Sequence, residues 1–128
     1  MKEKLDESFK YGFIGAQGFK IIKLEKDEAI VEYEVKESGM NPYGMVHGGI
    51  IFSLADSCAG ILGLMSGRRN VTTNSSINFI NAAKCKKLIA IAKILDEKKS
   101  IGYYEVNVYD ENKKLIATCL SNMYFLDK

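Results

Sequence analysis

The alternation of hydrophobic and polar positions divides the chain into helical and extended segments. Residues 1–12 show one apolar side, typical of a short amphipathic helix, which we expect to end at the glycines that follow. Two short alternating runs occupy residues 19–35, with Lys26 and Asp27 between them as a hairpin turn. Polar turns separate four later strand-like runs, at residues 71–79, 88–95, 103–110 and 115–126.

The stretch 47–67 is apolar almost all round, which predicts a helix that is buried on most sides. Consecutive strands with no helix between them favour antiparallel pairing and therefore an α+β fold. A curved antiparallel sheet wrapped around this one long helix satisfies both observations, and this arrangement is the hotdog architecture. The last run alternates over residues 116–125 well enough to be a central pairing strand.

Length and composition fit one globular domain over residues 1–128. The chain has 128 residues, 47% of them hydrophobic, and a chain of this size can bury about two-thirds of its unfolded surface. A net charge of +2 is not the basic excess that is expected of a nucleic-acid-binding protein. The charged N-terminus resembles no export signal, and the apolar run 50–65 contains Asp56 and is shorter than the ~20 residues that a bilayer requires. We therefore expect a cytoplasmic protein that binds neither nucleic acid nor membrane.

The three cysteines, Cys58, Cys85 and Cys119, form no close pair, and His47 is the only histidine. A disulfide framework needs an even number of cysteines, and a structural zinc site needs four ligands. We therefore expect three buried thiols in a reducing compartment and no metal site.

One stripe of the predicted helix carries only small residues and a single carboxylate. At 100° per residue, Ser53, Asp56, Gly60 and Gly63 all fall within about 40° of Gly49. Glycine costs about 1 kcal/mol relative to alanine inside a helix, so close approach of another backbone or of a thin ligand is expected here. The opposite face supplies the predicted core, namely Ile51, Leu54, Cys58, Ile61 and Met65.

Asp56 is the first candidate catalytic residue. It lies among apolar neighbours with no lysine or arginine one helical turn away, so desolvation is expected to raise its pKa toward the range of a general base. The alternative is a structural carboxylate that faces solvent or accepts a local hydrogen bond.

The start of the helix, His47-Gly48-Gly49, is the second candidate. The first amides of a helix have no partners within the helix, and glycine lets a carbonyl approach them closely, as in an oxyanion hole for acyl transfer. The alternative is a tight turn in which His47 only packs. A metal-ligand role is disfavoured because no second histidine exists.

The pattern Asn-x-x-Gly-x-x-His-Gly-Gly begins at Asn41, and Asp56 follows nine positions after the histidine (56 − 47 = 9). This pattern resembles hotdog-fold acyl-CoA thioesterases, and most closely the phenylacetic-acid-degradation (PaaI) type. The run 76–81 also resembles the third strand of that family, and the order of the elements fits throughout.

The resemblance implies an enzyme that hydrolyses an acyl-CoA to the free acid and CoA without a metal or redox cofactor. It implies that Asp56 acts as general base or nucleophile and that the Gly48 amide polarises the thioester carbonyl with help from Asn41. It also implies a hydroxyl that orients the water, with Thr72 as the first choice and Thr73 or Asn74 as alternatives.

The resemblance further implies a homodimer or homotetramer with the site across a dimer interface. Asp56 of one subunit would then work with Asn41, His47 and Gly48 of the other, and the small residues beside Asp56 would line a narrow tunnel. Pairing edge to edge would also cover an exposed strand edge. The residues expected to bind the substrate or the CoA phosphates are Gly49, Phe79, Lys84, Lys98, Lys99 and Ser100, with Arg68 and Arg69 as second candidates.

Two other functions are compatible with a hotdog fold. A hydratase or dehydratase of acyl thioesters needs an aspartate and a histidine together on one substrate, whereas His47 at a helix start suits carbonyl polarisation better. A non-catalytic acyl-CoA-sensing module is the other alternative. It would need an attached DNA-binding domain, for which the sequence leaves no residues, and it would have no need for Asp56.

Overall fold

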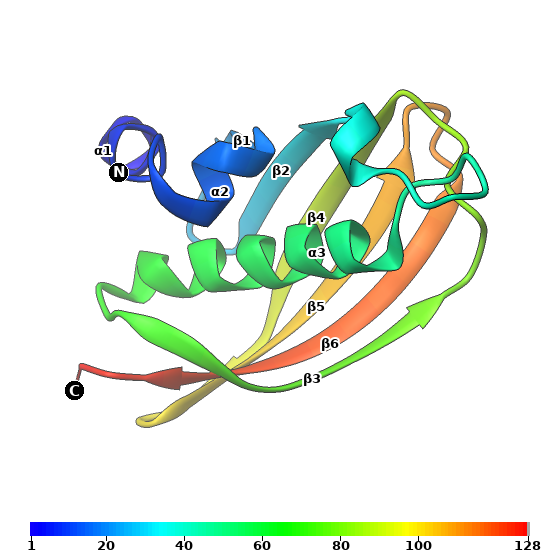
Figure 1. Cartoon of the computed structure of the whole chain (residues 1–128). Helices are drawn as coiled ribbons and strands as arrows, with labels where there is room; N and C mark the ends of the chain where they lie inside the picture. The colour runs from blue at the N-terminus through cyan, green and yellow to red at the C-terminus, as the bar shows by residue number, and fades with distance from the viewer. Residues whose placement is uncertain (128) are drawn as a thin grey trace.

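Six antiparallel strands form one curved sheet in the order β1-β2-β4-β5-β6-β3 in the computed structural model, which describes residues 1–127 (Figure 1). This order leaves β1 and β3 at the two edges and places β6 between β5 and β3, so the prediction of a central last strand is confirmed. The strands are β1 (Lys20–Leu24), β2 (Glu28–Glu34), β3 (Asn70–Phe79), β4 (Lys87–Glu97), β5 (Ile101–Asp110) and β6 (Leu115–Phe125).

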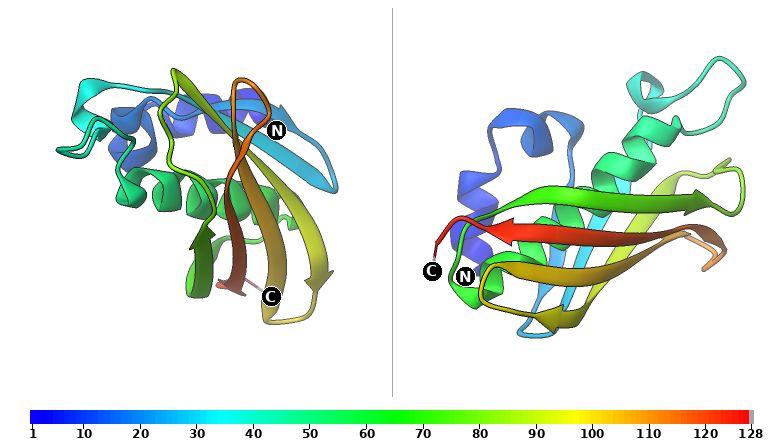
Figure 2. Two further views of the ribbon diagram at one scale, coloured as in Figure 1. Left: turned by 90° about the vertical axis from the view of Figure 1, so that its right-hand side faces the viewer. Right: turned by 90° about the horizontal axis from the view of Figure 1, so that it is seen from below.

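Helix α3 (Gly48–Gly63) lies in the hollow of the sheet, which curves around it (Figure 2). Its apolar face is buried as predicted, although Met65 falls in a following 3₁₀ turn (Leu64–Ser66) and is only half-buried. Gly67, in the left-handed region at φ 81°, ends this extension. By length and composition alone, Gly48–Ser66 could cross a membrane, but its buried side chains belong to the core of the sheet. The predicted α+β hotdog fold is confirmed.

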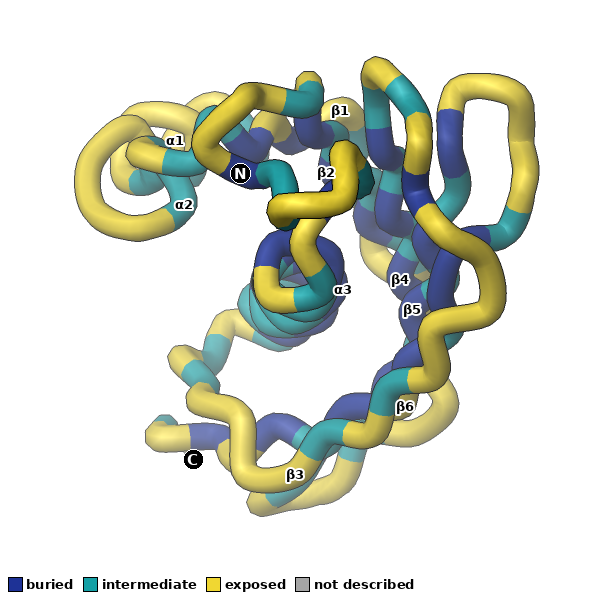
Figure 3. Tube along the Cα trace, turned by 45° about the vertical axis from the view of Figure 1, so that its right-hand side comes forward, coloured by how far each residue is buried: buried dark blue, intermediate teal, exposed yellow. Residues whose placement is uncertain are grey.

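The inner face of the sheet forms the rest of the core. Strands β2 and β5, and β4 over residues 87–92, alternate between buried and more exposed positions, as Figure 3 shows, because successive side chains of a strand point to opposite faces. Strand β3 differs, since most of its residues are exposed. The sheet therefore has a well-covered centre and one open edge.

The N-terminal segment folds into two short helices, α1 (Lys2–Ser8) and α2 (Gly12–Gln17). We expected the glycines at this point of the chain to end helical structure. This expectation is wrong for Gly12 and Gly15, because both lie within α2. A Cβ at Gly15 would lie 2.1 Å from the Lys10 carbonyl oxygen, so glycine allows α2 to pack back on the preceding turn. Neither helix contains a fully buried residue.

Two of the three thiols are buried, as predicted, and the third is not. Cys58 and Cys119 are fully enclosed, whereas Cys85 is half-buried, so the expectation of three buried thiols is wrong at Cys85. Burial raises the pKa of the Cys58 thiol to about 12. This thiol therefore stays protonated, and its Sγ donates to the Ala29 carbonyl oxygen at 3.4 Å.

Candidate active site

Edge strand β3 runs along the small-residue stripe of α3. A Cβ at Gly48 would lie 3.3 Å from the Phe79 ring, and the Asn70 amide donates to the Gly60 carbonyl oxygen at 3.1 Å. Between these two contacts, Thr72 meets Asp56. The small residues therefore allow a strand and its side chains to approach the helix. Close approach of another backbone was one of the two explanations that the sequence offered for these small residues.

Gly63 is explained by packing rather than by a ligand. A Cβ there would lie 2.7 Å from the Asn70 Nδ2 atom and 3.2 Å from the Tyr104 hydroxyl oxygen. Gly63 is buried beneath these two side chains. The expected tunnel therefore does not continue past Gly63, because protein side chains already fill that space.

Asp56 is half-buried, and its carboxylate accepts a hydrogen bond from a strand hydroxyl. The Thr72 Oγ1 atom donates to Asp56 Oδ1 at 2.5 Å. A bulge in β3 between Thr72 and Asn74 turns Thr73 the other way, so that its hydroxyl donates to the Asn122 carbonyl oxygen at 3.2 Å. The structure thus selects Thr72 among the three residues that the sequence left open.

A cavity of about 430 Å³ opens beside Asp56 and Thr72. This volume lies in the range of small-molecule sites in proteins. The apolar part of its wall comes from the N-terminal segment, the C-terminal half of α3 and β3, through Phe9, Ile14, Ile61, Leu64 and Val71. The cavity therefore places one carboxylate against a wall that is mostly apolar, although Ser57, Arg69 and Asn70 also line it.

The start of α3 offers one free backbone donor. The Gly49 N–H donates to His47 Nδ1 at 2.8 Å, and the Ile50 N–H donates to the His47 carbonyl oxygen at 3.0 Å. Within residues 1–127, the Gly48 N–H has no hydrogen-bond partner. His47 is therefore the N-cap of the helix, and the expected substrate contact of Gly49 cannot use its N–H, which is already occupied.

Asn41 lies beside Gly48. Its Oδ1 atom accepts hydrogen bonds from the amides of Tyr43 and Met45 at 2.9 and 3.0 Å, and these bonds shape the loop before the helix. The Nδ2 group remains as a donor. Asn41, Gly48 and Phe79 line one cavity of about 250 Å³, so the structure brings these three predicted residues together.

Within one chain, the Asp56 carboxylate and the free Gly48 N–H lie apart from each other. Gly48 and Asp56 are eight residues apart (56 − 48 = 8), which is about 12 Å along a helix at 1.5 Å per residue. They also line different cavities. Because reacting groups must approach within about 3–3.5 Å, the two groups of one chain cannot act on the same carbonyl.

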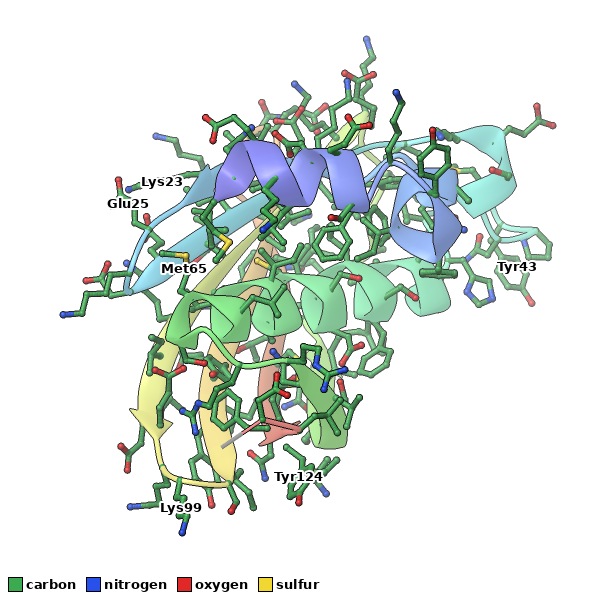
Figure 4. The ribbon with its side chains drawn as sticks, turned by 90° about the vertical axis from the view of Figure 1, so that its left-hand side faces the viewer. Lys23, Glu25, Tyr43, Met65, Lys99 and Tyr124 are labelled. Carbon is green, nitrogen blue, oxygen red and sulfur yellow. The ribbon has the colours of Figure 1, made fainter. Side chains whose placement is uncertain are left out.

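The residues expected to hold CoA are similarly dispersed. Lys84 precedes the eleven-residue strand β4, while Lys99 and Ser100 follow it, so about 37 Å of extended chain separates them at 3.4 Å per residue. Figure 4 shows Lys99 at the turn after β4, far from Tyr43 in the loop before α3. No single nucleotide could contact both groups within one chain.

The two arginines that were second candidates have partners within the chain. Arg68 donates to the carbonyl oxygens of Lys98 and Lys99 at 3.2 and 2.8 Å, and its guanidinium stacks on Phe125 at 3.6 Å. Arg69 pairs with Asp127 at 2.8 Å. Arg68 therefore fixes the turn that carries Lys98 and Lys99.

The family model described as the thioesterase superfamily matches residues 43–117. A Saccharolobus solfataricus protein, provisionally named an esterase, is 30% identical over 126 residues, which cover 97% of this chain and 86% of that protein. The acyl-coenzyme A thioesterase PaaI of Escherichia coli is 27% identical over 103 residues, covering 80% and 74% of the two chains.

Solved structures also match this chain. A Streptococcus mutans protein bound to acetyl CoA is 30% identical and superposes with a TM-score of 0.82, covering 86% of this chain and 90% of that one. A hypothetical thioesterase protein of Streptococcus pneumoniae, solved with coenzyme A, is 24% identical with a TM-score of 0.88, covering 96% and 98%.

The chain has the hotdog fold and belongs to the thioesterase superfamily. Within that superfamily it is of the PaaI type, as the motif around His47 predicted. The prediction of a thioester hydrolase is confirmed.

Proposed function

We propose that the chain hydrolyses an acyl-CoA to the free acid and CoA at a site shared between two copies. In each site, Asp56 of one copy acts with the Gly48 N–H of the other. One observation carries this proposal: the only unpartnered amide at the start of α3 and the only carboxylate on its stripe lie about 12 Å apart in one chain. A second copy supplies the missing half of each site.

Asp56 is proposed as the general base. The Thr72 hydroxyl occupies Oδ1, which leaves Oδ2 to accept a proton from a water molecule. The water oxygen bonds to the thioester carbon, and the Gly48 N–H donates to the oxyanion that develops. The carbon–sulfur bond then breaks, so that CoA leaves as a thiolate that takes up a proton and the acid remains.

The spacing of the two polar residues supports this assignment. Two further solved structures of the Streptococcus pneumoniae protein carry alanine in place of a threonine or an aspartate, and those two positions are sixteen residues apart. Asp56 and Thr72 have the same separation (72 − 56 = 16). Both residues also line the same cavity, which a functional pair requires.

Edge strand β3 is the proposed contact between the two copies. It is ten residues long, pairs on one side only with β6, and is largely exposed. An unpaired edge of this kind is normally covered in proteins, and pairing with a second β3 would cover it. The same strand carries Thr72 and Phe79, so this contact would form next to both halves of the site.

The oxyanion donor can be tested by Gly48→Pro with Gly48→Ala as its control. Proline is accepted at the first position of a helix, and His47, at ψ 136°, has the extended conformation that precedes proline. Both variants place a Cβ against Phe79, but only proline removes the N–H. We expect kcat to fall about 10²–10³-fold in Gly48→Pro relative to Gly48→Ala. Equal values in the two variants would exclude this amide as the donor.

The sharing of the site can be tested with mixed dimers. Asp56→Asn chains and Gly48→Pro chains, carrying different affinity tags, are coexpressed and purified in tandem. If the site is shared, one of the two sites in each mixed dimer has both native groups, so about half of the wild-type kcat is expected. If each site lies within one chain, every site carries a substitution and the mixed dimer is as inactive as its parents.

A further inference from the structure

Phe9 separates two cavities. One is the 430 Å³ cavity beside Asp56, and the other, of about 480 Å³, lies between the N-terminal helices and β1. Among the residues that the structure describes, Phe9 is the only one that lines both. We propose that the Phe9 side chain closes the acyl pocket and sets the longest acyl group that the enzyme accepts. This inference rests on the proposed thioesterase site.

The wall chemistry assigns the acyl group to this cavity. With the thioester carbon at Asp56, either the acyl chain or the pantetheine arm must extend past Phe9, Ile14 and Ile61. Pantetheine contains two amides, and burying an amide without a hydrogen-bond partner costs at least about 1–3 kcal/mol. An acyl chain has no such requirement and gains from apolar burial. The polar side chains of the wall include Arg69 and Asn70, which already bind Asp127 and the Gly60 carbonyl oxygen. The rest of the wall is mostly apolar and therefore favours the acyl chain.

The position of Phe9 makes it the end of the pocket. Phe9 follows α1 and precedes α2 in the chain, and Figure 4 shows these two helices alongside α3; the Phe9 backbone N–H donates to the Leu5 carbonyl oxygen at 2.7 Å. Phe9 is half-buried and packs against the core without belonging to it. An acyl chain that grows beyond the first cavity must therefore meet this ring before it can reach the second.

Without the Phe9 ring, the two cavities would form one longer channel. The second cavity continues along Phe19 and Ile21, which are both buried residues of the core. Four charged residues also line it, namely Lys2, Asp6, Lys10 and Lys20, so an acyl chain would have to lie along its apolar side. A longer acyl chain could then bury additional methylene groups there, each worth about 0.8 kcal/mol. We therefore expect the native enzyme to act on acyl-CoAs with a short acyl chain and to exclude long saturated chains.

The test compares Phe9→Ala with Tyr11→Ala over a series of saturated acyl-CoAs of increasing length. Tyr11 lies in the same segment, is 73% exposed and lines neither cavity, so it is a matched aromatic control. We expect kcat/KM of the wild type and of Tyr11→Ala to fall beyond a short chain. In Phe9→Ala, the ratio of kcat/KM for long over short chains should rise about tenfold or more.

Phe9→Trp is the opposite variant, and it should shift the profile toward shorter chains. Thermal unfolding verifies that each variant is folded, and Phe9→Leu replaces Phe9→Ala if alanine prevents folding. A merely structural role of Phe9 would lower kcat/KM for all chain lengths by one factor and leave the ratio unchanged. That outcome overturns the inference while the proposed function stands. Failure of the wild type to hydrolyse any acyl-CoA overturns both.

Discussion

The two long faces of α3 carry out different tasks. One face, with Leu54 and Cys58 at its middle, is fully buried against the centre of the sheet. The other, with Asp56 and Gly60, is half-buried and meets the edge strand β3, and only at its end is Gly63 buried beneath Asn70 and Tyr104. A face covered by strands on every side gains its free energy from apolar burial. A face beside an open edge can hold a polar group that still reaches a substrate.

The buried face should show the largest effect on stability. Leu54 is completely buried, so Leu54→Ala leaves a cavity and should lower the free energy of unfolding by about 2–5 kcal/mol. The adjacent Ser53→Ala removes only a hydroxyl that donates to the Gly49 carbonyl oxygen, and its effect should stay within about 0.5 kcal/mol. Urea unfolding measures both. A similar loss in both variants would remove the distinction between the two faces.

The stripe face should show the converse result. Asp56→Asn keeps the size of the side chain but removes the base, so kcat should fall about 10²-fold or more on the best acyl-CoA substrate. Its unfolding free energy should change little. Asp27→Asn, at an exposed aspartate that lines neither cavity, is the control and should keep full activity. Steady-state hydrolysis over a panel of aromatic and aliphatic acyl-CoAs is the measurement.

Removal of the strand hydroxyl should have a smaller effect on the same face. Thr72→Val deletes the hydrogen bond to Asp56, and a hydrogen bond to a charged group contributes about 1.5–3 kcal/mol, so kcat should fall about tenfold or more. Thr72→Ser keeps the hydroxyl and should retain most of the activity. Thr73→Val, whose hydroxyl faces Asn122, should behave like the wild type. Equal losses at both threonines would contradict the role of the bulge.

Gly60 and Gly63 of the stripe should respond differently to alanine. A Cβ at Gly63 would lie 2.7 Å from Asn70 Nδ2, so Gly63→Ala should destabilise the chain by about 1–3 kcal/mol. At Gly60 the nearest atom, Asn70 Oδ1, is 3.4 Å away, and the higher helix propensity of alanine should stabilise by up to about 1 kcal/mol. Thermal unfolding of the two variants compares them directly. A loss at Gly60 as large as at Gly63 would contradict this account of the stripe.

The smallest effect is expected at the exposed end of β3. The Arg69 guanidinium, through its hydrogen bonds, lowers the pKa of Asp127 from the ordinary value of 3.8 to about 2. A depressed carboxyl pKa stabilises the fold above the unfolded value, and this contribution is lost as the pH falls from about 4 to 2. The difference in melting temperature between wild type and Asp127→Asn should therefore be small at pH 7 and disappear near pH 2. A difference that persists at pH 2 would require another cause.

Periodicity in the sequence was sufficient to predict most of the fold. The alternating runs correspond to the six strands. The helical angles, counted at 100° per residue from Gly49, separate the buried face of α3 around Leu54 and Cys58 from the stripe around Asp56. Both patterns are local, because the pleat of a strand and the turn of a helix fix which side chains share a face. The N-terminal helix α2 was missed because Gly15 serves a close approach that periodicity does not express.

Residue type predicted which side chains belong to the candidate site, but their arrangement was decided by tertiary contacts. The motif identified Asp56, Thr72, Asn41 and Gly48, but it could not reveal that His47 occupies the Gly49 amide and leaves only Gly48 free. The choice of Thr72 over its neighbour depends on a bulge, which follows from pairing with β6. Which donors stay free and which hydroxyl faces the helix depend on segments far apart in the chain, and local sequence patterns contain no such information.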